Sequence, residues 1–283
     1  MKILGVITSF FPDIDELERN INSFISDIEY LIIWENTPKE KSYIYKLIEK
    51  LNSNKIEVRT TGKNEYLAVP FNLCAKYAKE HNFTHLLTMD QDSTFSTSHF
   101  ERYLQLIENL LDKKVAAFGP NSTSREQNKV NNGEVDYIFI SGAIYPIHVF
   151  LELQGFNENL VIDAIDTDYC LRAKDVGYQV IVIREVNLEH QMGYHYKHWT
   201  GLKIVPYSAQ RTYYYIRNTL WLWNRFPAYF EQSYKHSFVK YRIIYRTLKL
   251  IFEKDSFRKF TAIYTALWHF KMKRLGRYDK FIK

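Results

Sequence analysis

The sequence of 283 residues predicts an α/β protein in which helices flank an open sheet. Two observations support this fold class, and a third sets the last part of the chain apart. Strand and helix signals alternate along the first half of the chain. Polar residues directly follow several of the predicted strands, and Lys and Arg concentrate in residues 234–283. Because open α/β sheets bind ligands outside the carboxyl ends of their strands, the first part is expected to carry the binding site.

The predicted elements follow one another in chain order. Strands are expected at 2–8, 30–34, 55–60, 84–89 and 115–118, where short apolar or alternating runs are bounded by polar residues. Helices are expected at 14–25, 43–51, 67–81 and 103–111, where apolar residues recur every three or four positions. The polar run 121–132 predicts a loop or a hairpin tip.

Length and composition bound the class of protein. With 46% hydrophobic residues, the chain can bury a substantial core in one large domain or in one domain with an appendage. Cys74 and Cys170 lie far apart and match no metal-binding spacing, which predicts two reduced core residues. The first residues are typical of a strand and not of a signal peptide, and no segment reaches the roughly 18 to 20 apolar residues of a spanning helix. A cytoplasmic protein, in possible peripheral contact with the inner face of the cell membrane, is therefore expected.

The last part of the chain differs in charge. Residues 234–283 hold 14 Lys/Arg against 3 Asp/Glu, whereas the rest of the chain is net acidic. Aromatic and aliphatic residues at helical spacing predict two amphipathic helices here, and they are Tyr241, Ile244, Tyr245, Leu248 and Ile251, then Phe260, Ile263, Tyr264, Leu267 and Trp268. Two interpretations stay open. These helices either pack on the core and turn their basic residues outward, or lie on an anionic membrane surface.

An Asp-x-Asp pair, Asp90 and Asp92, directly follows the predicted strand at 84–89. Mg²⁺ and Mn²⁺ prefer oxygen ligands, and their sites often use one or two carboxylates while substrate phosphates and water complete the coordination. The pair therefore predicts a divalent cation held against a diphosphate. Asp-x-Asp is also common in solvated turns, so the pair is specific only together with other features.

Other strand ends carry polar clusters as well. Thr8 and Phe10 follow the first strand, Glu35 and Asn36 the second, and Asn64 the third. Glu35 and Asn36 are candidates for ribose or base contacts, because a carboxylate accepts from hydroxyl groups and an amide both donates and accepts. The alternative is that residues 36–38 only form a turn and cap the next helix. Neither the dinucleotide-binding nor the P-loop glycine pattern occurs, which disfavours an NAD enzyme or an ordinary P-loop NTPase.

A second acidic cluster contains Asp163, Asp166 and Asp168. If a helix begins near Asp166, its amino-terminal dipole and free amides stabilise carboxylates in the first turn. One interpretation is therefore helix capping. The other is a general base that takes a proton from an attacking hydroxyl, and three acids within six residues exceed what capping requires.

Several short motifs recur in a fixed order along the chain, at residues 6–8, 35–37, Asn64 with Asn72, 87–93, 141–143, 155–156, 166–172 and 214–218. Taken together, they resemble those of a family 2 glycosyltransferase of the GT-A fold, in particular the rhamnosyltransferase-like group of bacterial surface-polysaccharide synthesis. The resemblance implies a catalytic domain at 1–225, which leaves 226–283 as a basic, aromatic-rich helical extension. The expected fold is thus an α/β GT-A mixed sheet flanked by helices, with this extension at its carboxyl end.

The resemblance also implies roles for single residues. Asp92 matches the metal-binding position, and Asp90 the position near the ribose or the metal. Asp166 matches the catalytic base. Ile165 replaces the acid that usually precedes this base, so Asp163 or Asp168 would supply any supporting carboxylate. Glu35 stands where the family usually has Asp, which weakens the predicted nucleotide contact.

Downstream residues extend this expected site. His190 matches a position that supplies a further metal or diphosphate ligand, and His195 and His198 follow closely. A neutral imidazole suits Mn²⁺ better than Mg²⁺. Arg211 and Arg217 could face the acceptor or the diphosphate, or could instead anchor a helix.

The expected reaction is metal-dependent, inverting transfer of a sugar onto a hydroxyl of a growing polysaccharide or of a polyprenyl-diphosphate-linked glycan. By resemblance the donor is dTDP-rhamnose, with a UDP-sugar such as UDP-galactose as the alternative. Two other classes stay open: a protein that binds nucleic acid through its basic tail, and a catalytically silent adaptor or membrane-binding protein. Nucleic acid is not the expected partner, because the two acidic clusters would have no role in binding it. The oligomeric state is not predicted.

Overall fold

The computed structural model describes residues 1–111, 113–122, 133–190, 196–197, 203–204, 207–250, 253 and 255–281. The chain forms two compact units. The first contains Met1–Phe156 and Asp166–Met192, and the second contains Asn157–Ile165 and Gly193–Lys283. The predicted division at residue 225 stays a prediction, and the helix that ends there belongs to the second unit.

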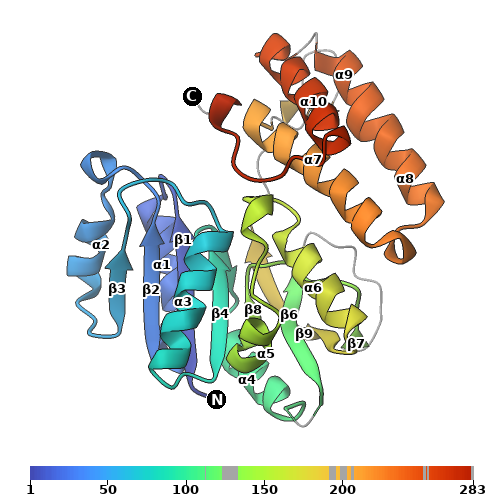
Figure 1. The fold of residues 1–283 in the computed structure, drawn as a ribbon. Helices are drawn as coiled ribbons and strands as arrows, with labels where there is room; N and C mark the ends of the chain where they lie inside the picture. The colour runs from blue at the N-terminus through green and yellow to red at the C-terminus, as the bar shows by residue number, and fades with distance from the viewer. Residues whose placement is uncertain are drawn as a thin grey trace. The chain divides into compact units, whose positions relative to one another are not determined.

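One mixed sheet organises the first unit (Figure 1). Its strands among the described residues are β1 (Ile3–Ser9), β2 (Tyr30–Glu35), β3 (Ile56–Arg59), β4 (His85–Asp90), β5 (Ser93–Phe95), β6 (Val115–Ser122), β7 (Gly133–Glu134), β8 (Ala143–Pro146) and β9 (Gln179–His190). Their order is β3-β2-β1-β4-β8-β6-β9-β5, and β7 also pairs with β9. Strands β3, β2, β1 and β4 run parallel, whereas β8 runs antiparallel to both β4 and β6.

Helices cover both faces of this sheet (Figure 1). They are α1 (Ile14–Asn22), α2 (Ile44–Leu51), α3 (Ala68–Glu80), α4 (His99–Glu108), α5 (Ile147–Glu152) and α6 (Ile165–Asp175). Short 3₁₀ turns of the first unit lie at Ile25–Asp27 and Lys39–Lys41, and a further one at Glu158–Leu160 belongs to the second unit. Helices α1, α2 and α4 pack on one core that includes Ile7, Ile33 and Met89. Because both faces are covered, strands such as β1 are buried along their whole length.

The other face of the sheet carries an aromatic cluster. Tyr145 of β8, Phe150 of α5, Phe156 and Tyr169 of α6 meet with ring centroids 5.0 to 5.7 Å apart. The side chain of Asn72 in α3 closes this region, since it accepts from the backbone amide of Phe156 at 2.8 Å and donates to its carbonyl at 2.9 Å. This packing fixes the start of α6 against the sheet.

The second unit is mainly helical. Its helices are α7 (Ala209–Arg225), α8 (Gln232–Phe238), a π-helical segment (Val239–Ile244), α9 (Tyr245–Lys249) and α10 (Ser256–Lys271), with 3₁₀ turns at Pro227–Tyr229 and Asp279–Phe281. A short pair, β10 (Tyr196–Lys197) and β11 (Lys203–Ile204), completes it. Helix α10 packs along α7 through small and buried residues that include Ala262, Ile263 and Ala266. Within the residues that the structure describes, we find no helix long and apolar enough to cross a membrane.

Most predicted elements are confirmed. All five predicted strands occur, and the helices expected at 14–25, 43–51 and 67–81 occur with ends shifted by a few residues. Helix α4 begins at His99, four residues before its predicted start, because Phe100 extends the buried face of Tyr103 and Ile107. Strands β8 and β9 lie in segments for which no strand is predicted. Of the predicted loop 121–132, residues 123–132 lie outside the described part. Cys74 and Cys170 are free and buried, as predicted.

Candidate active site

The Asp-x-Asp turn lies at the carboxyl end of β4 and is held on both sides of Asp90. The Asn20 side chain in α1 donates to the Asp90 carbonyl at 2.6 Å, and the Asp90 amide donates to the Ser141 hydroxyl at 3.1 Å. Asp90 and Asp92 are both partly exposed. Their carboxylates therefore lie on a fixed backbone where a ligand can reach them.

Gln91, between the two acids, ties this turn to the end of β1. Its side chain accepts from the Phe10 amide at 2.7 Å and donates to the Phe10 carbonyl at 3.3 Å. The rings of Phe10 and Phe11 are 46% and 53% exposed and lie edge to face, with centroids 4.7 Å apart. Thr8 is buried and lies opposite Asp90 in the β1–β4 pair. Of the two predicted nucleotide contacts on this strand end, Phe10 is the accessible one.

The Glu35 side chain at the end of β2 holds the turn that follows this strand. Glu35 is buried, and its two carboxylate oxygens accept from the Thr37 amide and from the Ser42 hydroxyl, each at 2.7 Å. Both carboxylate oxygens thus bind groups of the turn, and the contact of Glu35 with a nucleotide stays a prediction. The alternative of a turn-forming segment after β2 describes the geometry better.

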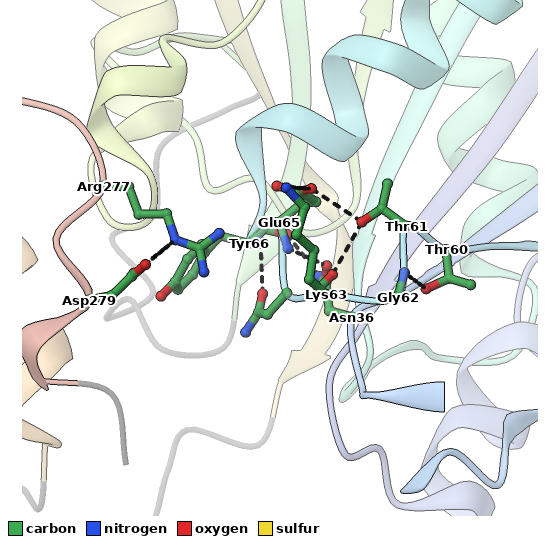
Figure 2. Close-up of polar contacts among 10 residues, drawn as sticks. Asn36, Thr60, Thr61, Gly62, Lys63, Glu65, Tyr66, Arg277 and Asp279 are labelled. Carbon is green, nitrogen blue, oxygen red and sulfur yellow. Dashed lines mark hydrogen bonds and ion pairs between the residues drawn. The ribbon is translucent and has the colours of Figure 1, made fainter. Parts of the chain in front are cut away.

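Asn36 connects this turn to the segment after β3 (Figure 2). Its side-chain oxygen accepts from the Glu65 amide at 2.8 Å, and its amide nitrogen donates to the Tyr66 carbonyl at 3.0 Å. Asn36 is buried as well, and its nucleotide contact stays a prediction. Asn64 remains partly exposed, and its side-chain oxygen accepts from the Tyr66 amide at 2.8 Å.

Asp166 lies in the first turn of α6 with its side chain partly exposed. One carboxylate oxygen accepts from the Thr167 amide at 2.7 Å and from the Thr167 hydroxyl at 3.3 Å. Desolvation by the surrounding protein raises the pKa of Asp166, although hydrogen bonds from backbone amides, including that of Ile140, oppose this rise. A carboxylate with a raised pKa is a stronger base than an ordinary Asp.

The segment Ile140–Ala143 links the two acidic clusters within the first unit. Ile140 neighbours Asp166, and the next residue, Ser141, binds the Asp90 amide. The Thr88 hydroxyl in β4 donates to the Ile140 carbonyl, and the Thr88 backbone carbonyl accepts from the Gly142 amide at 2.8 Å. Gly142 has a φ of +76°, and a Cβ there would lie 2.7 Å from Pro120, so only glycine fits. The turn therefore places Asp90 and Asp166 on neighbouring parts of one sheet edge.

The other acids of the second cluster have internal partners. Asp168 is completely buried and accepts from Arg172 Nε at 2.9 Å, one helical turn later. Arg172 also donates to the carbonyls of Leu153 and Gly155. Asp168 and Arg172 together thus hold α6 against the end of α5, and the role of Asp168 as a supporting catalytic acid stays a prediction.

In the second unit, Asn218 of α7 holds the segment that leads into α6. Its side-chain nitrogen lies 2.8, 2.8 and 2.9 Å from the carbonyl oxygens of Leu160, Ile162 and Asp163. Val161, Asp163 and Ala164 all have positive φ angles, between 60° and 69°. Non-glycine residues are strained in this region, and such strain persists only where neighbouring contacts hold it. Asn218 supplies such contacts.

The two predicted arginines differ in position. Arg217 is completely buried and donates to the carbonyls of Gly276 at 2.7 Å and Asn159 at 3.1 Å. The guanidinium thus joins segments of the second unit, and its contact with an acceptor or diphosphate stays a prediction. Arg211 is exposed, lies 3.6 Å from the Asp163 carboxylate and stacks over Tyr207. It remains accessible to an anionic ligand.

His190 ends β9, where its backbone lies opposite Ser93 in the antiparallel β5–β9 pair. This register brings its backbone next to the Asp-x-Asp turn. Nothing is described of its side chain, and His195 and His198 lie outside the described residues.

Four residues position the candidate site although no individual role is predicted for them from the sequence: Asn20, Gln91, Ser141 and Asn218. Gln91, Ser141 and Asn218 belong to motifs of the family resemblance, which was the available signal. Asn20 is an ordinary polar residue in a helix, and only the fold brings it to Asp90.

The chain is similar to known proteins both in sequence and in fold. No known protein-family model matches the chain. In sequence it is 24% identical over 243 residues to dTDP-rhamnosyl transferase RfbF of Shigella flexneri, across 78% of this chain and 79% of that protein. In structure it is similar to the mannosyltransferase PcManGT of Pyrobaculum calidifontis, solved with GDP-Man and Mn²⁺, with a TM-score of 0.60 and 11% identity over 96% of this chain and 75% of that one.

Two further structures share the fold. One is S. aureus TarS 1–349, solved with UDP-GlcNAc, with a TM-score of 0.58 and 14% identity over 97% of this chain and 82% of that one. The other is GalNAc-T7, solved with UDP, GalNAc and Mn²⁺, with a TM-score of 0.58 and 12% identity over 86% of this chain. This chain spans only 54% of the GalNAc-T7 chain. The predicted GT-A fold is confirmed, and the chain is similar in sequence to a dTDP-rhamnosyl transferase.

Proposed function

We propose that the protein transfers a sugar from a nucleoside diphosphate to an acceptor hydroxyl, with inversion at the anomeric carbon. The observation that carries this proposal is the link through Ile140 and Ser141 between Asp166 and the backbone of Asp90. One acidic cluster suits a diphosphate held through a cation, and the other suits proton removal. The sequence similarity to a dTDP-rhamnosyl transferase favours dTDP-rhamnose as the donor.

The residues of the Asp-x-Asp turn fit a divalent cation. Asp90 and Asp92 offer carboxylate oxygens, which Mg²⁺ and Mn²⁺ prefer, on a backbone that Asn20, Ser141 and Gln91 fix. In the described part of the chain, no group of three or more His, Cys, Asp or Glu residues forms a complete metal site. When bound, the cation would offset the charge that develops on the leaving diphosphate.

Phe10 and Asn64 are the proposed nucleoside contacts. Phe10 presents an exposed ring whose backbone is held by Gln91, and Asn64 presents a partly exposed amide after β3. An aromatic ring stacks on a nucleobase, and an amide both donates to and accepts from base edges. Thr8 supports this edge from within the sheet.

Asp166 is the proposed general base. Burial raises its pKa, which increases its affinity for the proton of an attacking hydroxyl. The hydrogen bonds from Thr167 orient one of its carboxylate oxygens. The acceptor oxygen then attacks the anomeric carbon from the face opposite the leaving diphosphate, so no covalent intermediate with the protein forms.

Three further residues complete the proposal. His190 is a proposed cation or diphosphate ligand because its backbone lies opposite Ser93, beside Asp92. Arg211 is a proposed contact for an anionic group of the acceptor, and Asp163, 3.6 Å from it, orients the guanidinium. The proposed acceptor is a bacterial polysaccharide or a polyprenyl-diphosphate-linked glycan.

The proposal is tested by a thermal-shift screen of dTDP-rhamnose, UDP-galactose and other UDP-sugars, each with and without Mn²⁺. We expect the melting temperature to rise most with dTDP-rhamnose and Mn²⁺ together, and we expect slow release of dTDP without an acceptor. The largest shift with a UDP-sugar would support the alternative donor. If no nucleotide sugar shifted melting or released nucleotide, the chain would be a silent protein of this fold and the proposal would be wrong.

A further inference from the structure

The last helix carries its aromatic side chains away from the protein interior. Phe257, Phe260, Tyr264 and Trp268 of α10 are each more than half exposed, and Phe257 reaches 82%. Their spacing of three or four residues places them along one side of the helix. Helix α10 instead packs against α7 through the buried Ala262, Ile263 and Ala266. The core of the unit therefore does not use the aromatic stripe.

A second exposed apolar stripe lies on the π-helical segment and α9. Tyr241, Ile244 and Leu248 are each more than half exposed, and Tyr245 lies between them. Glu253 connects the two stripes, because its carboxylate binds Arg246 of α9 and, at 2.8 Å, Lys259 of α10. Exposed apolar surface of this extent on a folded protein marks an interaction site.

Basic residues surround these stripes. A cavity of about 100 Å³ in the second unit is lined by Arg242, Arg246 and Lys249 together with Tyr207, Tyr215 and Tyr241. Lys271 ends α10, Lys273 and Arg274 follow it, and all three are exposed. Over residues 234–283 the charge is 14 Lys/Arg against 3 Asp/Glu. The apolar stripes thus lie within a strongly cationic surface.

We propose that the two stripes dock on an anionic phospholipid bilayer and that the cavity beside Arg242 and Lys249 receives a lipid phosphate. Aromatic side chains settle at the headgroup level, and the basic residues meet the negative surface. A second copy of this surface would bring like charges together. Nucleic acid would leave Ile244 and Leu248 without a suitable partner, because aliphatic side chains do not stack on bases as aromatic rings do. This proposal goes beyond the sugar transfer and does not depend on it.

Co-sedimentation of the full chain with vesicles tests the docking. Vesicles of phosphatidylcholine alone are compared with vesicles that also contain phosphatidylglycerol, at low and high salt. We expect binding to the anionic vesicles that weakens with salt. Arg242→Gln with Lys249→Gln should lower the partition coefficient about 30-fold, which corresponds to about 1 kcal/mol for each charge. The matched control, Lys39→Gln with Lys41→Gln, removes two exposed charges of the first unit and should bind like the wild type.

A second pair of variants tests the aromatic contribution. Phe257→Gln with Trp268→Gln should weaken binding to both kinds of vesicle, whereas Tyr43→Gln with Tyr137→Gln, which changes exposed aromatics of the first unit, should not. Inorganic phosphate should weaken binding no more than chloride does at the same ionic strength, and stronger competition by phosphate would count against the bilayer. The proposal is overturned if the wild type stays in the supernatant, or if the Arg242/Lys249 variant binds like its Lys39/Lys41 control. It is also overturned if the Phe257/Trp268 variant dissociates a dimer in light scattering.

Discussion

The Ser141 hydroxyl accepts a hydrogen bond of 3.1 Å from the backbone amide of Asp90. Ser141 precedes β8, whereas Asp90 ends β4, so this bond joins two neighbouring strands at the edge where the site lies. The residue before Ser141, Ile140, neighbours Asp166. One short turn therefore sets the positions of the proposed cation ligands and of the proposed base.

Ser141→Ala tests this turn. The substitution leaves the Asp90 amide without its acceptor, so we expect the free energy of unfolding to fall by about 1 kcal/mol. Donor binding in the presence of Mn²⁺ should weaken as well, because the Asp-x-Asp backbone loses one of its anchors. Denaturant unfolding and titration calorimetry measure the two effects. Ser26→Ala, at an exposed site of the same unit, is the control and should change neither.

The pKa of Asp166 predicts a pH dependence of turnover. A base must be ionised, and since burial raises the pKa of Asp166, the acid limb of kcat should lie at higher pH than for an ordinary Asp. The profile of kcat against pH at saturating donor and acceptor measures this limb. A limb at or below the usual range of Asp would contradict the assignment of Asp166 as the base.

The same shift predicts a gain in stability for Asp166→Asn. A raised folded-state pKa means that the protonated carboxyl is favoured in the fold, and that this stabilisation is lost as pH rises through the folded pKa. Asn resembles the protonated form, so the variant should melt at a higher temperature than the wild type at neutral pH. The difference should shrink toward zero below the pKa of Asp in the unfolded chain. Thermal melting across pH measures it, and a variant that is less stable at neutral pH would contradict the predicted desolvation.

Asn218→Ala tests the contacts that hold the strained segment before α6. Three carbonyl oxygens lose their donor, so we expect a loss of about 1 to 3 kcal/mol in the free energy of unfolding. Because Asp166 follows this segment directly, kcat should fall more than the KM for the donor rises. Asn218→Gln, which keeps the amide, should recover part of kcat. Equal effects on kcat and KM in both variants would indicate a purely structural part for Asn218.

The sequence predicts the parts of this protein that depend on local patterns. Apolar runs predict β1 to β4 and β6, and helical spacing predicts α1 to α3, because side-chain periodicity and burial agree there. Strand β8 consists only of the four residues Ala143–Pro146, and Pro146 is already the N-cap of α5. So short a strand gives little periodic signal. Its antiparallel place between β4 and β6 depends on tertiary pairing alone.

The candidate site shows the same limit. The acids Asp90, Asp92 and Asp166 are predicted from their place after a strand or at a helix start. Glu35 and Asp168 belong to equally suggestive clusters, yet the fold buries them and pairs them internally. Sequence alone does not distinguish a carboxylate that binds a ligand from one that holds a turn, since both occur at strand and helix ends.

The central claim is that Asp92 serves donor binding and Asp166 serves proton removal. It is tested most directly by measuring donor affinity with Mn²⁺ and kcat together for Asp92→Ala and Asp166→Asn. We predict that Asp92→Ala loses both metal-dependent binding and transfer, and that Asp166→Asn binds the donor like the wild type while kcat falls by about 10²- to 10⁴-fold. Near-normal turnover of Asp166→Asn, or unchanged metal-dependent binding by Asp92→Ala, would contradict the account.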